Sequence, residues 1–277
     1  MNNPRVSVVV PAYRNLDFLG ATLDSILAQD YEDYELVVAD HSSSDGSEAL
    51  LARYSGHPRV RVLSPTPAGG GALANWNRVS EHARGELIKL VCGDDLIAPT
   101  ALREQVQALD AHPGAVLVAS PRSLVDAAGR EVIGSRGLAG LSGRVAGREA
   151  IRRCVRAGSN IFGEPGCVLF QRRLLEQEGG WDNSFPYLID QATYTRILLH
   201  GDFVALPRTL ASFRISATQW SVRLTREQAA QAQGFHRWLR ANVPGLLTPA
   251  DVVVGNTRAW LMARARRLAY WWLSRRM

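Results

Sequence analysis

Short apolar runs alternate with amphipathic stretches through the first hundred residues. The apolar runs cover residues 6–10, 35–39, 60–63 and 86–91. Residues 16–28 repeat Leu19, Leu23 and Ile26 at helical spacing, and helices are also predicted at 47–54 and 72–83. Short runs that are apolar throughout are typical of strands buried on both faces, and their alternation with helices predicts a mainly parallel sheet flanked by helices. We therefore predict an α/β fold.

The alternation continues less regularly beyond residue 98. Further helices are predicted at 100–112, 147–157, 172–178 and 189–200, and further strands at 115–119, 167–170 and 203–206. Residues 127–147 are rich in Gly, Ala and Ser and predict loops and hairpins, and residues 158–166 predict a loop. No repeat or low-complexity linker interrupts the chain, so we expect its parts to pack as one body.

Composition narrows the class of protein. With 46% hydrophobic and 21% charged residues, the chain can bury a core and is not disordered. The net charge is +6, and almost all positive charges are arginines, since Lys89 is the single lysine. The arginines could bind phosphates, or they could reflect a coding bias towards arginine. The basic residues are scattered until the last stretch, which argues against a nucleic-acid partner. Three cysteines without metal-ligand spacing, and the lack of an apolar N-terminal run, predict a cytoplasmic protein.

Candidate chemistry gathers where predicted strands end. Parallel sheets bind ligands outside the carboxyl ends of their strands, and Asp40, Gly69–Gly71 and Asp94-Asp95 all fall there. Two adjacent carboxylates suit a divalent cation that neutralises a diphosphate, although an acidic turn that caps the next helix has the same appearance. Asp40 could bind a base or ribose, or serve the Ser-rich turn after it. The glycines lack the spacing of a dinucleotide fingerprint or P-loop.

As an ordered set, these motifs resemble the family-two glycosyltransferases of the GT-A fold. The resemblance runs from Val6 to about Val222. It rests on residues 8–13 (Val-Val-Val-Pro-Ala-Tyr), 36–40 (Leu-Val-Val-Ala-Asp), 43–46, 75–77 (Asn-Trp-Asn), 83–88, 93–95 (Gly-Asp-Asp), 168–170 with Arg173, 179–182 (Gly-Gly-Trp-Asp), and Asp190 six residues before Arg196.

The resemblance implies roles for matching residues. The donor, a nucleotide-diphosphate sugar, is expected to contact Pro11, Ala12, Tyr13, Asp40, Asn75 and Asp94. Asp95 matches the ligand of a divalent metal, Mn²⁺ or Mg²⁺, and Asp190 matches the catalytic base. Trp181 and Asn160, the latter in the 158–166 loop, fall on the acceptor side; a core aromatic is the equally weighted alternative for Trp181. Three segments follow: a nucleotide-sugar-binding half (1–98), an acceptor-binding and catalytic half (99–222) and a C-terminal helical extension (223–277).

The implied reaction is an inverting, metal-dependent transfer. A hydroxyl of a glycan or lipid-linked acceptor attacks the sugar's anomeric carbon, with Asp190 as general base, in the synthesis of a cell-envelope polysaccharide. A catalytically silent nucleotide-sugar-binding or scaffold protein on the same fold is the alternative. A nucleotidyltransferase would normally need a basic glycine-rich loop after the first strand, and residues 11–15 are not one.

Four positions depart from the pattern of the family. His41 and Cys92 stand where acidic residues are common, Ile189 where glutamate is frequent, and Ser216 where histidine often occurs. Intact Asp94, Asp95 and Asp190 favour activity despite these departures.

The C-terminal stretch 252–277 combines arginines with tryptophans. Its arginines are too frequent for a membrane-spanning helix. Two interpretations carry equal weight: an amphipathic helix at the inner face of the plasma membrane, which would suit a lipid-linked acceptor, or a helix packed on its own domain or in a homodimer.

Overall fold

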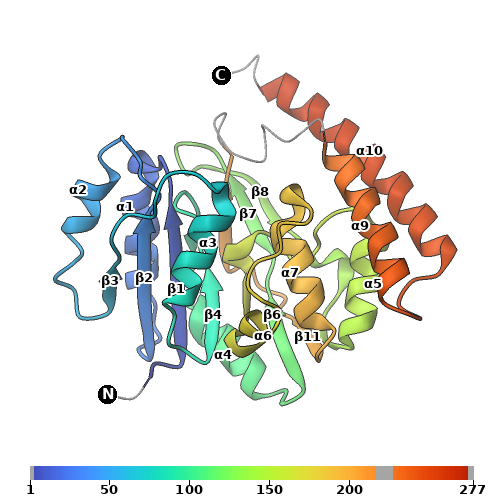
Figure 1. The fold of residues 1–277 in the computed structure, drawn as a ribbon, viewed down its shortest axis with the longest axis horizontal. Coiled ribbons are helices and arrows are strands. Elements are labelled where there is room, and N and C mark those ends of the chain that lie inside the picture. Colours follow the sequence, from blue (N-terminus) through green and yellow to red (C-terminus); the bar gives the residue numbers. More distant parts are fainter. Residues whose placement is uncertain (1–2, 216–226, 274–277) are drawn as a thin grey trace.

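The structure is a computed structural model that describes residues 3–215 and 227–273. Its main feature is an eight-stranded sheet in the order β3-β2-β1-β4-β10-β6-β11-β9 (Figure 1). The strands are β1 (Val6–Ala12), β2 (Tyr34–Asp40), β3 (Val60–Val62), β4 (Leu87–Leu90), β6 (Ala115–Ala119), β9 (Gly143–Val145), β10 (Val168–Gln171) and β11 (Asp202–Ala205). The four strands β3, β2, β1 and β4 run parallel to one another, as their alternation with helices predicts. Strand β10 runs antiparallel to both β4 and β6.

A second, four-stranded sheet has the order β5-β12-β7-β8. It contains β5 (Leu96–Ile97), β7 (Arg122–Val125), β8 (Glu131–Arg136) and β12 (Ala211–Arg214). Strands β8 and β9 lie within the stretch predicted as loops and hairpins. Strands β5, β7 and β12 do not follow from the apolar pattern, because they are short and two of them contain buried arginines.

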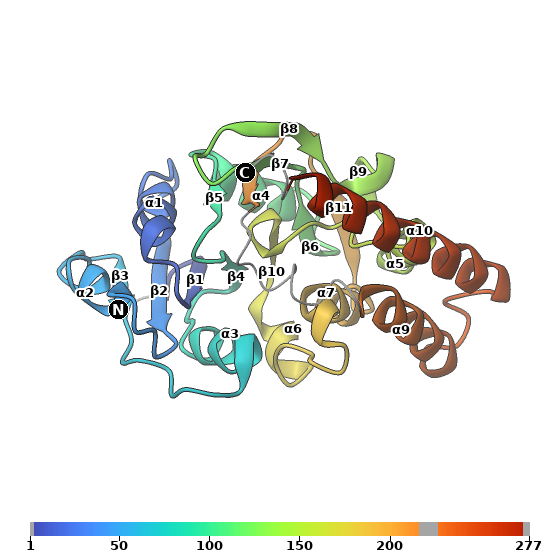
Figure 2. The ribbon, with the colours of Figure 1, turned by 90° about the horizontal axis from the view of Figure 1, so that it is seen from above.

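Helices cover both faces of the large sheet. The helices of the structure are α1 (Leu16–Leu27), α2 (Ser47–Ala52), α3 (Gly71–Glu81), α4 (Ala101–Asp110), α5 (Gly147–Ala157), α6 (Arg172–Gln177), α7 (Ile189–Leu198), α9 (Gln228–Asn242) and α10 (Pro249–Leu273). Short 3₁₀ turns are η1 (Leu138–Gly140), η2 (Pro165–Cys167) and η3 (Pro186–Leu188). In Figure 2, α3, α6 and α7 lie on one side of the sheet and α1 and α4 on the other.

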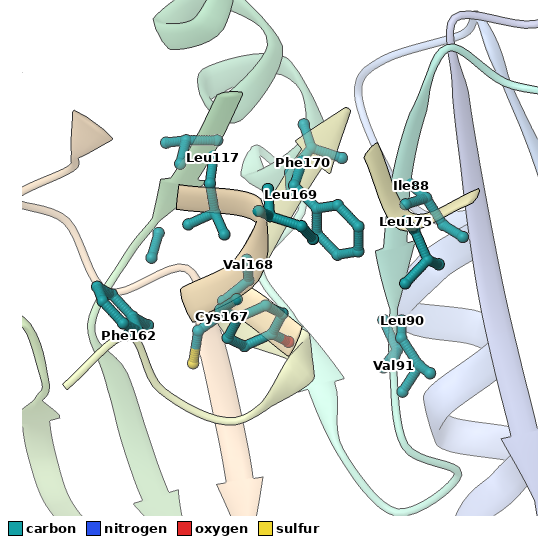
Figure 3. Packing of buried hydrophobic residues seen from close by; sticks show 14 of the residues in the cluster. Ile88, Leu90, Val91, Leu117, Phe162, Cys167, Val168, Leu169, Phe170 and Leu175 are labelled. Carbon is teal, nitrogen blue, oxygen red and sulfur yellow. The ribbon is translucent and has the colours of Figure 1, made fainter. Parts of the chain in front are cut away.

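The core is continuous across the large sheet. Every residue of β1 is buried, and Val8, Val9 and Val37 have no exposed surface. Figure 3 shows the β10 side chains between Leu117 of β6 and Ile88 of β4, as the strand order requires. Because β4 precedes residue 98 and β10 follows it, the first two predicted segments share one sheet.

Lys89 lies in the middle of this core with no exposed surface. Its Nζ donates to Gln105 Oε1 (2.9 Å) and to the carbonyl oxygen of Gly166 (2.6 Å), and Gln105 Nε2 donates to the carbonyl oxygen of Cys167 (2.7 Å). Burial lowers the pKa of Lys89 to about 7. The Lys89 side chain of β4 therefore forms hydrogen bonds with both α4 and η2, and η2 lies at the end of the 158–166 loop.

The C-terminal extension packs against α5 at the end of the molecule away from β3 (Figure 1). Asp251 of α10 is fully buried and accepts hydrogen bonds from Arg152 Nε (2.9 Å) and Arg156 Nη1 (2.7 Å) of α5. Gly255 permits this close packing, since a Cβ there would collide with the carbonyl oxygen of Val155. Among the described residues, no helix combines the length and apolarity needed to cross a bilayer.

Candidate active site

A pocket of about 250 Å³ opens beside the end of β4. Asp94 and Cys92 after β4, Glu164 and Asn160 from the 158–166 loop, and Asp190 at the start of α7 all line it. Residues far apart in the sequence therefore meet in one cavity. The two carboxyl groups expected on the donor side and the acceptor side, those of Asp94 and Asp190, face the same space.

Asp190 is held in place by two donors. Asn160 Nδ2 donates to Asp190 Oδ2 (2.8 Å), and the backbone N–H of Gln191 donates to Asp190 Oδ1 (2.7 Å). Burial raises the pKa of Asp190 to about 7, and the charge of Glu164 adds to the rise while both hydrogen bonds oppose it. A carboxyl group with a pKa near neutral pH is suited to accept a proton during a reaction.

The adjacent acidic residues have different environments. Asp94 lines the pocket, while its backbone carbonyl oxygen accepts a hydrogen bond from Arg214 Nε (2.9 Å). Asp95 is 2% exposed, and its Oδ1 accepts from the backbone N–H of Arg214 (3.1 Å). Burial, and then the charge of Asp94, raise the pKa of Asp95 well above its ordinary value. Asp95 therefore lies behind Asp94, anchored to β12.

Cys92 lines the pocket together with Asp94, Asp190 and Glu164. Burial raises the pKa of the Cys92 thiol, and the charges of Asp95, Asp94, Asp190 and Glu164 raise it further, in that order. Four carboxyl groups therefore act on one point of the pocket wall. The thiol keeps its proton in this field, which argues against a nucleophilic role for Cys92.

Arg122 partly balances this negative charge. Its Nη2 donates to Glu164 Oε1 (2.7 Å), its Nε forms an ion pair with the same carboxylate, and its Nη1 donates to the carbonyl oxygen of Arg136 (3.1 Å). Arg122 is 7% exposed and also lines the pocket. The pair ties β7 to the 158–166 loop.

Four of the predicted donor contacts lie where β1 and β2 end and do not line this pocket. We call them the donor wall: Pro11, Ala12, Tyr13 and Asp40. Pro11 and Ala12 pair in parallel register with Ala39 and Asp40, and Tyr13 beyond them is 48% exposed. Asp40 is 2% exposed, and its Oδ2 accepts from the backbone N–H of Ser43 (2.7 Å). Its Oδ1 has no hydrogen-bond partner among the residues that the structure describes. Asp40 therefore has a buried acceptor atom that no described residue satisfies.

His41 takes a structural contact beside this wall. Its Nε2 lies 2.8 Å from the carbonyl oxygen of Gly69, and its ring lies 5.6 Å from that of Tyr13. The His41 side chain thus links the end of β2 to the glycine-rich loop at Gly69–Gly71. Of the other three departures, Cys92 and Ile189 line the pocket, and Ser216 lies outside the described residues.

Asn75 connects the strand ends rather than facing the pocket. Its Nδ2 donates to the carbonyl oxygens of Ala12 (3.1 Å) and Ala39 (3.2 Å), and its Oδ1 accepts from Thr66 Oγ1 (2.6 Å). Both ends of the amide are thereby used within the protein. The contacts of Asn75 hold β1 and β2 in the register that shapes the donor wall.

Trp181 is a buried core residue in this structure. It is 4% exposed, and its Nε1 donates to Ser80 Oγ (2.9 Å). Its ring packs at 5.0 Å against Trp76, and it is Trp76 that lines the pocket. Trp181 therefore supports the pocket from behind.

Several pocket residues do not follow from the sequence. Trp76 and Glu164 lie inside motifs or loops that the resemblance singles out, so a closer comparison of those segments could have found them. Arg122 lies on an unpredicted strand, and His236 lies in the C-terminal extension beyond the resemblance. Nothing in the local pattern marks either one.

The acidic residues fit a divalent cation that is shared with a diphosphate. Within the described part of the chain, no group of three or more His, Cys, Asp or Glu side chains is arranged to hold a metal by itself. Mg²⁺ sites of this kind use one or two carboxylates together with phosphate oxygens and water. Carboxylates are the donors that such ions prefer, and the excess of negative charge around Cys92 favours a cation.

The mixed sheet with its flanking helices is that of the GT-A fold, and the pocket lies where strand β4 ends. The model for "Glycosyl transferase family 2" matches residues 7–179, and the chain belongs to this family of glycosyltransferases. The predicted family, fold and enzyme class are thereby confirmed.

The relatives that this chain resembles have varied descriptions. An uncharacterized protein of Mycobacterium tuberculosis is 30% identical over 94% of this chain and 82% of its own length. The poly(ribitol-phosphate) beta-glucosyltransferase of Bacillus spizizenii is 36% identical over 35% of this chain and 16% of its own length.

Solved structures share the fold. S. aureus TarS in complex with UDP-GlcNAc superposes with a TM-score of 0.68 at 18% identity, covering 90% of this chain and 69% of that one. The mannosyltransferase PcManGT of Pyrobaculum calidifontis, in complex with GDP-Man and Mn²⁺, has a TM-score of 0.64 at 22% identity, covering 94% and 70%.

Proposed function

We propose that this glycosyltransferase is an inverting, metal-dependent enzyme that moves a sugar from a nucleotide diphosphate to a hydroxyl of a glycan or lipid-linked acceptor in surface polysaccharide synthesis. The observation that carries the proposal is the shared pocket of Asp94 and Asp190. A donor sugar placed between them would have its diphosphate near Asp94 and its anomeric carbon within reach of a hydroxyl beside Asp190.

The donor site is assigned to the ends of β1, β2 and β4. The unpartnered Oδ1 of Asp40 suits an N–H of the base or a ribose hydroxyl, and the exposed ring of Tyr13 offers a stacking surface. Asn75 positions this wall. Structural neighbours solved with UDP-GlcNAc and with GDP-Man support a nucleotide sugar as the donor.

Asp95 and Asp94 would hold the divalent cation, Mn²⁺ or Mg²⁺. When bound, such a cation acts as a Lewis acid that stabilises the departing diphosphate. The neighbour solved with Mn²⁺ supports this assignment. The hydrogen bond from Arg214 to Asp95 fixes the orientation of the acidic pair.

Asp190 serves as the general base on the acceptor side. It removes the proton of the acceptor hydroxyl while the hydroxyl oxygen attacks the anomeric carbon and the bond to the diphosphate breaks. Asn160 holds the carboxylate in position for this step. Attack opposite the leaving group inverts the anomeric configuration, so no covalent sugar–enzyme intermediate is needed.

Thermal shift measurements with UDP, GDP and dTDP, each with and without Mn²⁺, test the donor site. We expect at least one nucleotide to raise the melting temperature in a metal-dependent way. The variant Asp95→Asn keeps an acceptor for the Arg214 N–H but lacks the charge, so it should lose the metal dependence. If none of the three nucleotides stabilises the wild-type chain, the donor site is misassigned.

Asp190→Asn tests the base and the alternative of a silent binding protein. We expect donor binding to persist while turnover falls about 10²- to 10⁴-fold. The anomeric configuration of the product, read from its NMR coupling constant, tests inversion. Near-normal turnover in Asp190→Asn would remove Asp190 as the base, and a wild-type chain that binds donor but transfers nothing would favour the silent protein.

The outer face of α10 is assigned to an anionic membrane surface at the inner face of the plasma membrane. Val253, Trp260 and Leu261 are 64%, 42% and 53% exposed, on the side of the helix opposite the buried Asp251 and Ala259. The guanidinium of Arg264 lies 3.8 Å from the ring of Trp260. Exposed apolar side chains beside arginines are the features by which interfacial helices bind anionic lipids.

Vesicle co-sedimentation tests this surface. The chain should bind phosphatidylcholine vesicles that contain phosphatidylglycerol more strongly than phosphatidylcholine alone, and Trp260→Glu with Leu261→Glu should abolish the difference. A different outcome would assign the face to a homodimer: the wild type binds no vesicles, and light scattering shows a dimer for the wild type but not for the double variant.

A further inference from the structure

Residues of the C-terminal extension also line the pocket that contains Asp190. Its far wall is formed by Gln228, Ala232 and His236 of α9 and by Ala259 of α10. These helices lie at the end of the molecule away from β1 and β2, where the donor wall is assigned (Figures 1 and 2). A ligand group beside these helices therefore lies at the end of the pocket away from the donor wall.

His236 is a polar residue of this wall, and one of its two ring nitrogens has no hydrogen-bond partner among the described residues. Its side chain has no exposed surface, and its Nδ1 lies 2.9 Å from Asn256 Oδ1 of α10. An amide oxygen can only accept, so the ring hydrogen lies on Nδ1 and Nε2 carries a lone pair. Burial lowers the pKa of His236, which keeps the ring neutral near pH 7. Nε2 has no hydrogen-bond partner among the described residues.

The packing of α10 fixes this ring. A Cβ at Gly255 would lie 3.2 Å from His236 Cε1, so glycine lets the helix lie directly against the imidazole. A Cβ at Gly158, where the 158–166 loop begins, would collide with the backbone nitrogen of Ala259. The same helix therefore positions both the ring and the loop that carries Asn160.

A buried acceptor without a donor is costly, and a ligand that supplies the donor recovers that cost. The pocket lining from η3, α9 and α10 includes the apolar residues Pro186, Leu188, Ala232 and Ala259, and Gln228 is the other polar residue that α9 contributes. A sugar supplies hydroxyl donors together with apolar C–H faces, and both match this wall. A second carboxylate or phosphate does not match it, because a lone pair on Nε2 repels an anion.

We propose that His236 is an acceptor-binding residue, whose Nε2 accepts a hydrogen bond from a hydroxyl of the acceptor sugar. Asn256 positions the ring by fixing its tautomer. The inference rests on the proposed transferase reaction and extends it, since it makes the C-terminal extension part of the acceptor site. The hydroxyl bound by His236 is a recognition group and is distinct from the hydroxyl that Asp190 deprotonates.

Two matched variants separate recognition from structure. His236→Asn keeps a donor near the position of Nδ1, where it can still reach Asn256, but has nothing at the position of Nε2. His236→Gln places an amide oxygen near the position of Nε2. The assay acceptor is the member of a panel of n-octyl glycosides that the wild type uses fastest. We expect His236→Asn to raise the KM for this acceptor about tenfold, with donor affinity and kcat within about twofold, and His236→Gln to recover part of the loss.

Monodeoxy forms of the same octyl glycoside identify the hydroxyl. One of them should lose affinity for the wild type and lose nothing further in His236→Asn, which is the signature of a shared contact. An acceptor KM that is unchanged in His236→Asn overturns the inference. Equal losses of donor and acceptor affinity, or a large fall in melting temperature in both variants, also overturn it by assigning His236 a structural role.

Nitrogen NMR of ¹⁵N-histidine-labelled protein provides a readout that needs no turnover. Titration with the octyl glycosides in the presence of UDP and Mn²⁺ should shift the Nε2 resonance of His236 while its Nδ1 resonance stays in place. A fixed Nε2 resonance with a glycoside that the enzyme uses would contradict the contact. If the wild type transfers sugar to no acceptor and the Nε2 resonance still shifts, the proposed reaction fails while the binding site stands.

Discussion

Asp190 lies between one side chain that stabilises its charge and another that opposes it. Asn160 donates a 2.8 Å hydrogen bond to the carboxylate, while Glu164 contributes a like charge from the same loop. Burial raises the pKa of Asp190 to about 7. Because a general base must be ionised, activity should rise with pH through the pKa of this group.

Asn160→Ala removes a hydrogen bond that lowers the pKa of Asp190. The acid limb of the kcat/KM profile should therefore move to higher pH, with a severalfold loss of activity at pH 6 relative to pH 8. A profile measured with saturating donor checks this shift. An unchanged acid limb would show that another group controls it.

Glu164→Gln should move the same limb in the opposite direction. Loss of the glutamate charge lowers the pKa of Asp190, and the released charge of Arg122 acts in the same sense. At pH 6 the variant should retain a larger share of its pH 8 activity than the wild type does. A limb that moves to higher pH in both variants would mean that each merely disturbs the loop.

Sequence and structure agree best on the location of three residues that the family resemblance singles out. Asp94, Asn160 and Asp190 are named by the sequence, and the structure brings them into one pocket. Asn75 and Trp181 turn inward because the protein itself satisfies their polar atoms. A sequence shows which residues are polar, but it does not show which neighbours will form hydrogen bonds with their polar atoms.

At the scale of elements, the pattern of apolar residues predicted the strands of the large sheet except β9 and missed most of the small sheet. β7 and β12 each contain a buried arginine, and those charges break the apolar run. Arg214 is 4% exposed because the backbone oxygens of Asp94, Asp126 and Ala127 accept its hydrogen bonds. Whether such segments form strands depends on contacts with distant parts of the chain, which the local apolar pattern does not show.

The joint between α10 and α5 depends on one carboxylate. Burial opposes the ionisation of Asp251, but hydrogen bonds from Arg152, Thr248 and Arg156 outweigh it and hold its pKa below the ordinary value. A group with a lowered pKa stabilises the fold above its unfolded pKa and loses that effect as pH falls through the folded pKa.

Asp251→Asn should therefore lower the melting temperature by about 3–6 °C at pH 7. The difference from the wild type should shrink at strongly acidic pH, where the wild-type carboxylate is also protonated. Differential scanning calorimetry across pH checks both parts. Arg153→Gln provides a matched control, since Arg153 pairs only with Glu149 of its own helix among the contacts that the structure describes.

At the scale of the whole molecule, the large sheet crosses the boundary expected at residue 98. β4 pairs with β10, and β10 pairs with β6, so hydrogen bonds join the two predicted halves through their cores. We expect a single cooperative unfolding transition in residues 3–215, with equal calorimetric and van't Hoff enthalpies. Two resolved transitions would show that the halves are separate thermodynamic units.

The burial of Lys89 also makes the chain its own reporter of global opening. A protease that cuts only after lysine has a single target, which lies in the middle of β4 and is wholly enclosed. Local fraying of the chain ends or of α10 does not release that bond. Digestion should therefore yield just two fragments, 1–89 and 90–277, at a rate set by complete unfolding. Nucleotide or acceptor that binds the native chain should slow this cleavage, so that affinity can be measured from a gel without any turnover.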